Sequence, residues 1–259
     1  MVTEAPLHVF QVDKATVQVY PSKSSGGRAA ASQAASILRD AIARRGQARI
    51  IVASGTSQED VISAFVQIPD LEWRLIEVFH MDEYIGMPET HPASFRRWVK
   101  THLVDLVHPA RVHYLAGEAA NLGEECQRYG NLLRAAPIDL CFLGFGENGH
   151  IAFNDPHVAD FNDHLVVKRV DLDERCRRQQ VGEGHFPDLA AVPREALTLT
   201  CPVLMSAEHL ICCVPELRKA EAVRNALLGP KSPACPASLV RTHPQASIFL
   251  DVESASLLP

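Results

Sequence analysis

Residues 144–156, with the sequence GFGENGHIAFNDP, hold several residue types that can do chemistry within a short stretch. Their glycines permit a tight turn and let backbone N–H groups approach a ligand closely. His150 follows this turn, with Asn148 before it and Asp155 after it. A histidine held in one tautomer by a carboxylate can act as an acid or a base near neutral pH. We therefore predict that His150, Asn148 and Asp155 are catalytic and that Gly146 contacts the ligand.

A pair of acids at residues 81–84 (MDEY) follows a predicted strand. Adjacent side chains of an extended chain point to opposite sides, so at most one of Asp82 and Glu83 can face a cleft. A carboxylate at such a position could take a proton from a carbon next to a carbonyl. The alternative is an acidic turn in which Asp82 caps a short helix. The residues alone leave both interpretations open.

The segment SGTS at residues 54–57 joins a predicted strand to the start of a helix. Hydroxyls and free N–H groups at a helix N-terminus can bind phosphate, so Ser54, Gly55 and Thr56 are candidates for holding an anion. The Gly-Lys-Ser/Thr ending of a P-loop is missing, which argues against nucleotide hydrolysis. Lys219 opens a later helix and could add a positive charge to the same site. A plain helix cap and a solvated surface lysine are the alternatives.

Other kinds of site find little support in the sequence. Residues 144–149 match the dinucleotide pattern G-x-G-x-x-G, but Pro156 and the two residues before it would end the long helix that this pattern requires. The histidines show no H-E-x-x-H spacing and the cysteines form no C-x-x-C pair, so we expect no metal site. No G-x-S-x-G motif of serine hydrolases is present. We expect no organic cofactor either.

Composition limits the range of partners. The chain has 259 residues and a net charge of -6, which argues against a nucleic-acid partner. Its apolar runs are too short to span a bilayer, and the first 13 residues do not have the pattern of a signal peptide. Seven cysteines, several inside apolar runs, are typical of reduced thiols. We therefore expect a cytoplasmic protein with no membrane partner.

Short apolar runs alternate with helical patterns along the chain. Strands are predicted at residues 48–54, 74–80, 112–115, 138–145, 165–170, 196–201, 209–214 and 246–251, and helices at 27–45, 57–66, 95–106, 118–135 and 217–228. This alternation predicts a mostly parallel sheet covered by helices on both faces, in a single domain of residues 1–259. In such sheets, ligands bind beyond the carboxyl ends of the strands. The candidate segments described above all follow predicted strands.

The chain resembles the glucosamine-6-phosphate deaminase/isomerase family, which is related to the 6-phosphogluconolactonases. That family carries Met-Asp-Glu-Tyr, then His-Pro-x-Ser, and later Gly-x-Gly-x-[Asn/Asp]-Gly-His-Ile-x-Phe-Asn-Glu-Pro. The matching segments here are Met81–Tyr84, His91–Ser94 and Gly144–Pro156. Order and spacing look similar along nearly the whole chain. The resemblance implies a three-layer, modified Rossmann-like α/β fold.

The resemblance also implies roles for the candidate residues. Asp82 matches the base that enolises the sugar, and His150 matches the acid/base that opens its ring. Asn148 stands where the family has Asp or Asn. Asp155 matches a glutamate that supports the histidine, and it is one methylene shorter.

The residues that correspond to the family's phosphate-binding positions match less closely than the catalytic ones. Lys219 matches a phosphate-binding lysine, and residues 54–56 lie where the family has a Gly-Gly-Thr loop. The loop has lost a glycine and a proline. The second phosphate-binding arginine of the family has no clear counterpart, because residues 179–186 look like an insertion. Three arginines just before that insertion suit a solvated helix face, although one could reach a phosphate: Arg175, Arg177 and Arg178.

The reaction implied is aldose–ketose isomerisation of an amino-sugar 6-phosphate with release of ammonia, giving fructose 6-phosphate. The expected partner is thus a small sugar phosphate; whether the chain forms a homo-oligomer is left open. One alternative keeps the fold and hydrolyses a sugar-phosphate lactone, although lactonases typically continue Gly-His-Thr-Ala-Ser where this chain has Gly-His-Ile-Ala-Phe. The other is a sugar-phosphate sensor without catalysis.

Overall fold

The centre of the molecule is a mixed sheet of eight strands. A computed structural model describes residues 4–259, and its main sheet has the strand order β1-β2-β11-β10-β7-β3-β4-β6. Only β1 and β2 pair antiparallel; the other neighbours are parallel. The strands are β1 (His8–Val12), β2 (Ala15–Tyr20), β3 (Ala48–Val52), β4 (Ile76–His80), β6 (Arg111–His113), β7 (Leu140–Leu143), β10 (His209–Val214) and β11 (Ala246–Asp251). The predicted α/β class with a mostly parallel sheet is confirmed.

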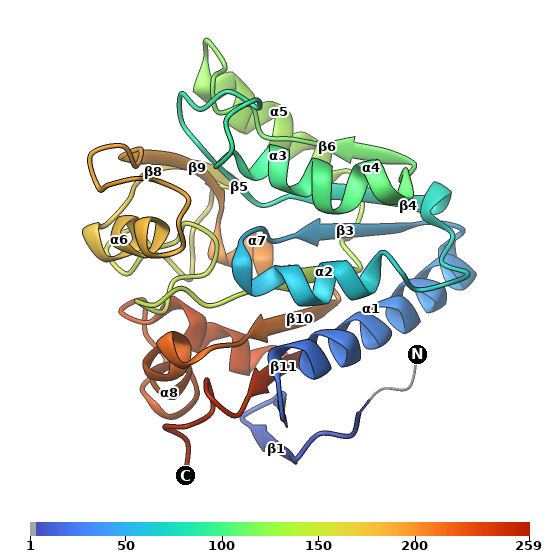
Figure 1. The fold of residues 1–259 in the computed structure, drawn as a ribbon. Helices are drawn as coiled ribbons and strands as arrows, with labels where there is room; N and C mark the ends of the chain where they lie inside the picture. Colours follow the sequence, from blue (N-terminus) through green and yellow to red (C-terminus); the bar gives the residue numbers. More distant parts are fainter. Residues whose placement is uncertain (1–3) are drawn as a thin grey trace.

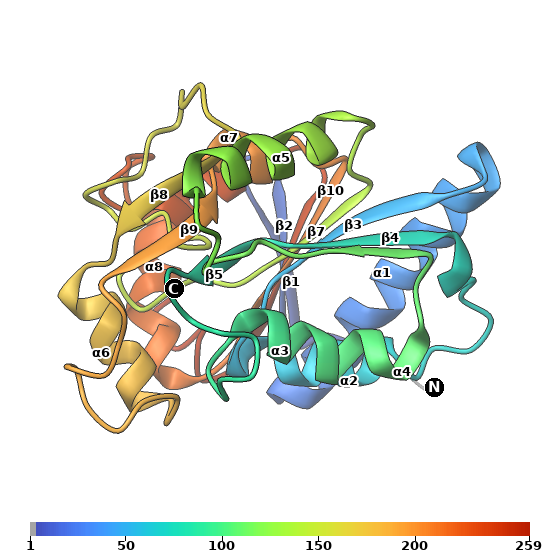
Figure 2. The ribbon, with the colours of Figure 1, turned by 90° about the horizontal axis from the view of Figure 1, so that it is seen from above.

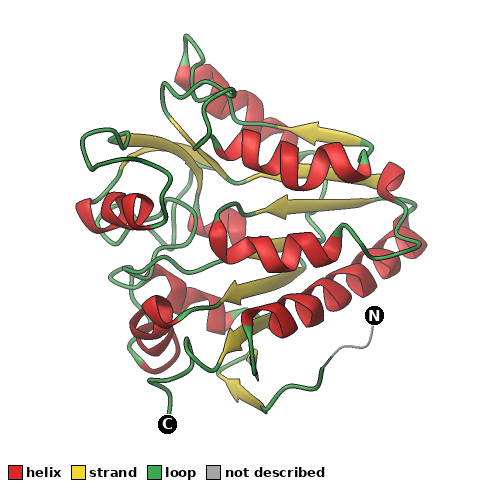
Figure 3. Cartoon of the chain, viewed as in Figure 1, coloured by secondary structure: helices red, strands yellow, loops and turns green. Residues whose placement is uncertain are grey.

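Helices cover both faces of this sheet. They are α1 (Lys23–Arg45), α2 (Glu59–Phe65), α3 (Phe95–Val99), α4 (Asp105–Val107), α5 (Leu122–Arg134), α6 (Glu174–Gly182), α7 (Cys201–Leu204) and α8 (Ala220–Leu228). Figure 2 shows α1, α2 and α3 on one side of the sheet and α5 and α7 on the other. Figure 3 shows the same arrangement with the strands enclosed between helices. The result is the three-layer arrangement that the resemblance implies.

The buried strands supply apolar side chains to both faces. In β7, Leu140 and Phe142 join the core beneath α1, α2 and α3, whereas Cys141 and Leu143 join the core beneath α5, α7 and α8. Side chains alternate along a strand, so a strand buried on both faces must be apolar at every position. The continuous apolar runs in the sequence therefore mark the inner strands of the sheet.

A second, three-stranded sheet lies beside the carboxyl ends of the first. It consists of β5 (Asp82–Tyr84), β9 (Glu195–Leu199) and β8 (Val167–Asp171), all antiparallel. In Figure 1 the arrowheads of β3 and β10 point toward this sheet and α6. The strands predicted at residues 165–170 and 196–201 lie in this second sheet and not in the parallel one. Arg169 and Asp171 are exposed on one face of β8, whereas Val170 is buried on the other, and this pattern suits an antiparallel sheet with one wetted face.

Several element boundaries differ from the predicted ones. Strands β1 and β2 were not predicted. Helix α1 begins at Lys23 rather than residue 27, because Ser22 and Ser25 form a capping box ahead of it. Helix α5 begins at Leu122 rather than residue 118, because the side chain of Asn121 caps it. Among residues 4–259, no helix is both long enough and apolar enough to cross a membrane.

Candidate active site

A cavity of about 70 Å³, partly open to solvent, lies between the two sheets at the carboxyl ends of the parallel strands. Loops that follow β3, β4, β7 and β10 line it, together with the end of α6. The predicted site residues on its wall are Ser54, Gly55, Thr56, Asp82, Gly146, His150 and Lys219. Asn148 and Asp155 lie behind the wall, in contact with the segment that carries His150. The structure thus brings together all of the segments singled out in the sequence.

The turn after β7 brings its backbone against the imidazole of His150. The N–H of Gly146 donates to the carbonyl of His150 at 2.9 Å, and that of Gly149 donates to Gly146 at 2.9 Å. A Cβ on Gly146 would overlap the imidazole ring. Gly149 has a φ of +84°, which favours glycine. Both glycines are therefore needed for this conformation, in which His150 lies at the cavity wall.

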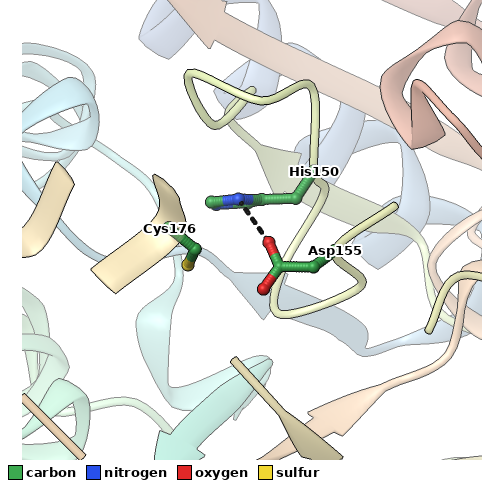
Figure 4. A group of neighbouring side chains, drawn as sticks. All are labelled: His150, Asp155 and Cys176. Atoms are coloured by element: carbon green, nitrogen blue, oxygen red, sulfur yellow. Dashed lines mark ion pairs between the residues drawn. The ribbon is translucent and has the colours of Figure 1, made fainter. Parts of the chain in front are cut away.

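Asp155 stands directly behind the imidazole, as Figure 4 shows. Its Oδ1 lies 3.0 Å from Nδ1 of His150, although the N–H direction is not aligned with that oxygen. The carboxylate also accepts from the Asn148 side chain at 2.9 Å and the Asp173 backbone N–H at 3.0 Å. Burial alone would raise the pKa of Asp155, but His150, Asn148 and Asp173 outweigh it and lower the pKa. The shorter aspartate thus still reaches the histidine and stays ionised.

Asn148 braces the turn rather than facing the cavity. Its Oδ1 accepts from the backbone N–H of His150 at 3.0 Å. Its Nδ2 donates to Asp155 and, at 2.7 Å, to the carboxylate of Asp173. Asn148 therefore joins the imidazole segment to the acid behind it.

Asp82 reaches the cavity from the other sheet. It is 6% exposed, and burial first, then the charge of Glu83, raises its pKa well above the usual range. Glu83 turns away and accepts from the hydroxyl of Ser94 at 2.7 Å and from Nε of Arg96 at 3.3 Å. The expectation that at most one of the two acids faces the cleft is confirmed. Ser94 caps α3, so Asp82 does not serve as a helix cap there.

Thr198 connects the strand of Asp82 to the segment after His150. It pairs with Asp82 across β5 and β9. Its hydroxyl accepts from the backbone N–H of Phe153 at 3.1 Å, and its side chain is fully buried. One residue of β9 thus contacts both of the segments that carry candidate catalytic groups. Sequence reasoning missed this role, because nothing local to Thr198 indicates it.

The loop after β3 lines one part of the cavity. Gly55 has a φ of +99° and precedes a short 3-10 turn, Thr56–Gln58, that leads into α2. The hydroxyl of Thr56 accepts from Nη2 of Arg218 at 2.9 Å. A Cβ on Gly144 would come within 3.0 Å of the hydroxyl of Ser57, so the two loops approach closely.

Lys219 projects into this part of the cavity and is only 2% exposed. Burial is the main cause that lowers its pKa. It is therefore not a solvated surface lysine. Its neighbour Arg218 was missed by sequence reasoning, and the one available signal was its position beside Lys219 at the end of β10.

The basic cluster on α6 does not reach the cavity. Arg175 pairs with Glu221, and Arg178 pairs with Glu174, all four being exposed. Arg177 donates to backbone carbonyls between residues 189 and 192. The side chains of this region that line the cavity are Gln179, Gln180 and Glu183. None of these was predicted, because Gln179 and Gln180 lie on α6 and Glu183 directly follows it, whereas the predicted candidates follow strands.

Three side chains behind the cavity come close enough to share a metal ion. Their ligand atoms lie within 4.8 Å of one another: His150, Asp155 and Cys176. Burial first, and then the charge of Asp155, raises the pKa of the Cys176 thiol well above its usual range. Metals bind the thiolate, so this set is better suited to holding the imidazole in place than to ligating a metal.

The cavity lies at the carboxyl edge of a parallel α/β sheet, where proteins of this class bind ligands, and an acid, a histidine and a lysine line it. The family model for glucosamine-6-phosphate isomerases/6-phosphogluconolactonase matches residues 21–249. The chain therefore belongs to this family.

Individual relatives agree with this assignment. A glucosamine-6-phosphate deaminase of Exiguobacterium sibiricum is 35% identical over 73% of each chain. Another, of Pseudarthrobacter chlorophenolicus, is 32% identical over 90% of each chain. The solved structure of a monomeric glucosamine-6-phosphate deaminase superposes with a TM-score of 0.84 at 27% identity, covering 93% of this chain and 99% of that one. A 6-phosphogluconolactonase of Trypanosoma brucei, with a TM-score of 0.75 at 17% identity over 97% and 100% of the chains, shares the fold.

Proposed function

We propose that this chain is a glucosamine-6-phosphate deaminase, which converts the amino-sugar phosphate and water into fructose 6-phosphate and ammonia. The observation that carries the proposal is the shared cavity: Asp82, His150, Lys219 and the loop of residues 54–57 all line it. Two proton-transfer groups and an anion site in one cavity are what an isomerisation of a sugar phosphate requires. The deaminases among the relatives support this choice of substrate.

His150 opens the sugar ring in this proposal. The imidazole takes the proton of the anomeric hydroxyl and delivers a proton to the ring oxygen, which breaks the bond between C1 and that oxygen. The ionised Asp155 behind the ring stabilises the imidazole while it carries the extra proton. Asn148 holds Asp155 and the turn in fixed positions relative to each other through its hydrogen bonds.

Asp82 then moves a proton between carbons. Its carboxylate removes the proton from C2 of the open-chain aldehyde, and the electron pair shifts to the carbonyl. The same proton is returned to C1 while a proton passes from the amine nitrogen to the oxygen on C1, which leaves an imine at C2 that water hydrolyses to the ketose and ammonia. The raised pKa of Asp82 suits this role, because a base is most effective when its pKa approaches the working pH.

In this proposal the phosphate binds in the part of the cavity lined by Lys219 and the loop of residues 54–57. Backbone N–H groups and hydroxyls of Ser54, Gly55 and Thr56 face the anion, and Lys219 neutralises part of its charge. Gly146 contributes the cavity floor between the phosphate and His150.

We place this reaction in the cytoplasm, where amino-sugar phosphates are metabolised. The seven cysteines are all free in the structure, which suits a reducing compartment.

The test is to incubate the purified protein with glucosamine 6-phosphate and to follow ammonia and fructose 6-phosphate together. Equal amounts of both products, formed at a rate proportional to enzyme, would support the proposal. Acid released from 6-phosphogluconolactone, with no ammonia from the amino sugar, would instead support a lactonase. Binding of both sugars without turnover would support a sensor.

A further inference from the structure

An ionised carboxylate lies within the proposed phosphate end of the cavity. Glu183 follows α6, and its side chain is 6% exposed. Its Oε1 accepts from Nη1 of Arg218 and lies 3.9 Å from Nζ of Lys219. Gln179 donates to the same oxygen at 2.8 Å, and His185 lies 3.4 Å from the other one. Glu183 thus contacts both cations at this end of the cavity.

The carboxyl group of Glu183 is charged at neutral pH. Burial alone would raise its pKa, but His185, Lys219 and Arg218 outweigh burial and lower the pKa to about 2. A neutral carboxylic acid could accommodate a phosphate as a hydrogen-bond donor. An ionised one repels it.

The positive charges near the loop of residues 54–57 are already paired with acids. Lys219 has Glu183 at 3.9 Å. Arg218 has Glu183 and Glu216, each at 2.7 Å, and Glu147 at 3.6 Å. A phosphate dianion that approaches Lys219 therefore meets a fixed negative charge about as far from the lysine as the phosphate itself would be.

We propose that Glu183 is a specificity-determining residue that competes with anions for Lys219. A ligand that offers only a phosphate gains too little from the cavity to offset this repulsion. A sugar phosphate gains further contacts at the Asp82 and His150 wall, which is where discrimination against inorganic phosphate arises. The identity of the favoured ligand rests on the proposed function, but the competition for Lys219 does not.

The experiment compares the wild-type chain with Glu183→Gln, which removes the charge and keeps the shape. Isothermal titration with inorganic phosphate is expected to show that Kd falls about tenfold or more in the variant, because a like charge close to the bound anion is gone. With glucosamine 6-phosphate, KM is expected to fall less, and inhibition by inorganic phosphate to become stronger. The matched control is Glu174→Gln, which lies on the same α6 and is 64% exposed, and which should leave Kd unchanged.

Unchanged or weaker phosphate binding in Glu183→Gln would overturn the proposal, and would mean that Glu183 serves to position Lys219. Should that variant not fold, as judged by circular dichroism, Glu183→Asp decides. It withdraws the charge from Lys219 by about 1.5 Å, one carbon–carbon bond, so a smaller gain in phosphate affinity is expected, and no gain would refute the competition. The phosphate titration needs no turnover, so it tests the competition for Lys219 even if the proposed deaminase activity is absent.

Discussion

Asp82 and Asp155 are both buried carboxyls, yet their pKa values move in opposite directions. Asp155 receives hydrogen bonds from Asn148 and Asp173 and faces a histidine, which together overcome the effect of burial. Asp82 has burial and the neighbouring charge of Glu83, and both raise its pKa. Acids whose surroundings separate their pKa values in this way can divide the work of proton transfer and electrostatic support.

Removing either proposed proton-transfer group should reduce turnover strongly. We expect Asp82→Asn and His150→Ala each to lower kcat about 100-fold or more, since a positioned acid or base contributes at least that factor. The measurement is ammonia release under saturating glucosamine 6-phosphate, with circular dichroism to verify folding. Asp171→Asn, an exposed aspartate at the end of β8, is the control. Near-normal turnover in purified Asp82→Asn would rule out the mechanism.

The role of Asp155 can be separated from that of His150. We expect Asp155→Asn to lower kcat about tenfold or more while KM changes little, because the amide cannot stabilise a protonated imidazole. Initial rates measured from pH 6 to pH 9 should show this loss at each pH. An unaltered kcat would mean that Asp155 serves the fold alone.

Site residues that stand in a recognisable local segment could be predicted from the sequence. Site residues defined only by contacts between distant parts of the chain could not. The glycine turn, His150 and Asp82 stand in recognisable segments next to strands. Glu183 and Arg218 meet across α6 and the end of β10, 35 positions apart in sequence, and only the folded chain brings them together. A pairing of this kind leaves no local pattern.

At the scale of elements, burial decides what can be predicted from the sequence. Strands β3, β7 and β10 are covered on both faces and are apolar except for Arg49 and His209 near their starts, so the sequence marks them clearly. Strand β1 is an exposed edge strand with no such run, and it was missed. The partners of β5, β8 and β9 could not be predicted, since nothing in these short segments indicates the strand with which each one pairs.

The link between β9 and the histidine segment can be tested by removing one hydroxyl. Thr198→Val keeps the shape but leaves the N–H of Phe153 buried without its acceptor. We expect the free energy of unfolding to fall by about 1–3 kcal/mol, the cost of an unsatisfied buried group. Urea unfolding followed by fluorescence measures it. The control, Thr16→Val, loses a solvent-exposed hydrogen bond to Gln11 and should cost much less; equal losses would contradict the interpretation.

At the scale of the whole molecule, the cavity is assembled from segments that span most of the chain, from Ser54 to Lys219. Anything that destabilises the fold therefore also disperses the site. His80, which lies next to the segment of Asp82, is a residue whose protonation would destabilise the fold. It is buried, its Nε2 has no hydrogen-bond partner within residues 4–259, and burial first, then the charge of Arg96, lowers its pKa to about 3.

Stability should consequently fall as the solution becomes acidic. The folded state keeps His80 neutral, whereas the unfolded chain binds a proton there below about pH 6.5. The free energy of unfolding is therefore not reduced by His80 above pH 6.5, and it decreases as pH falls from 6.5 toward about 3. Between pH 7 and pH 5 we expect wild type to lose about 2 kcal/mol more than His80→Gln. Urea unfolding at both pH values gives the difference. Equal losses of unfolding free energy in the two proteins would show that groups other than His80 determine the pH dependence.

The attachment of both proposed catalytic segments to Thr198 has a consequence for the proposed reaction. Asp82 is held by strand pairing and Phe153 by a hydrogen bond to one side chain, so the carboxylate and the imidazole have a common rigid frame. Ring opening and carbon deprotonation involve different atoms of the sugar, and they need those atoms in different places. In the proposed mechanism the frame is stationary, so rotation about bonds of the linear sugar would supply the movement, and the phosphate would serve as its pivot.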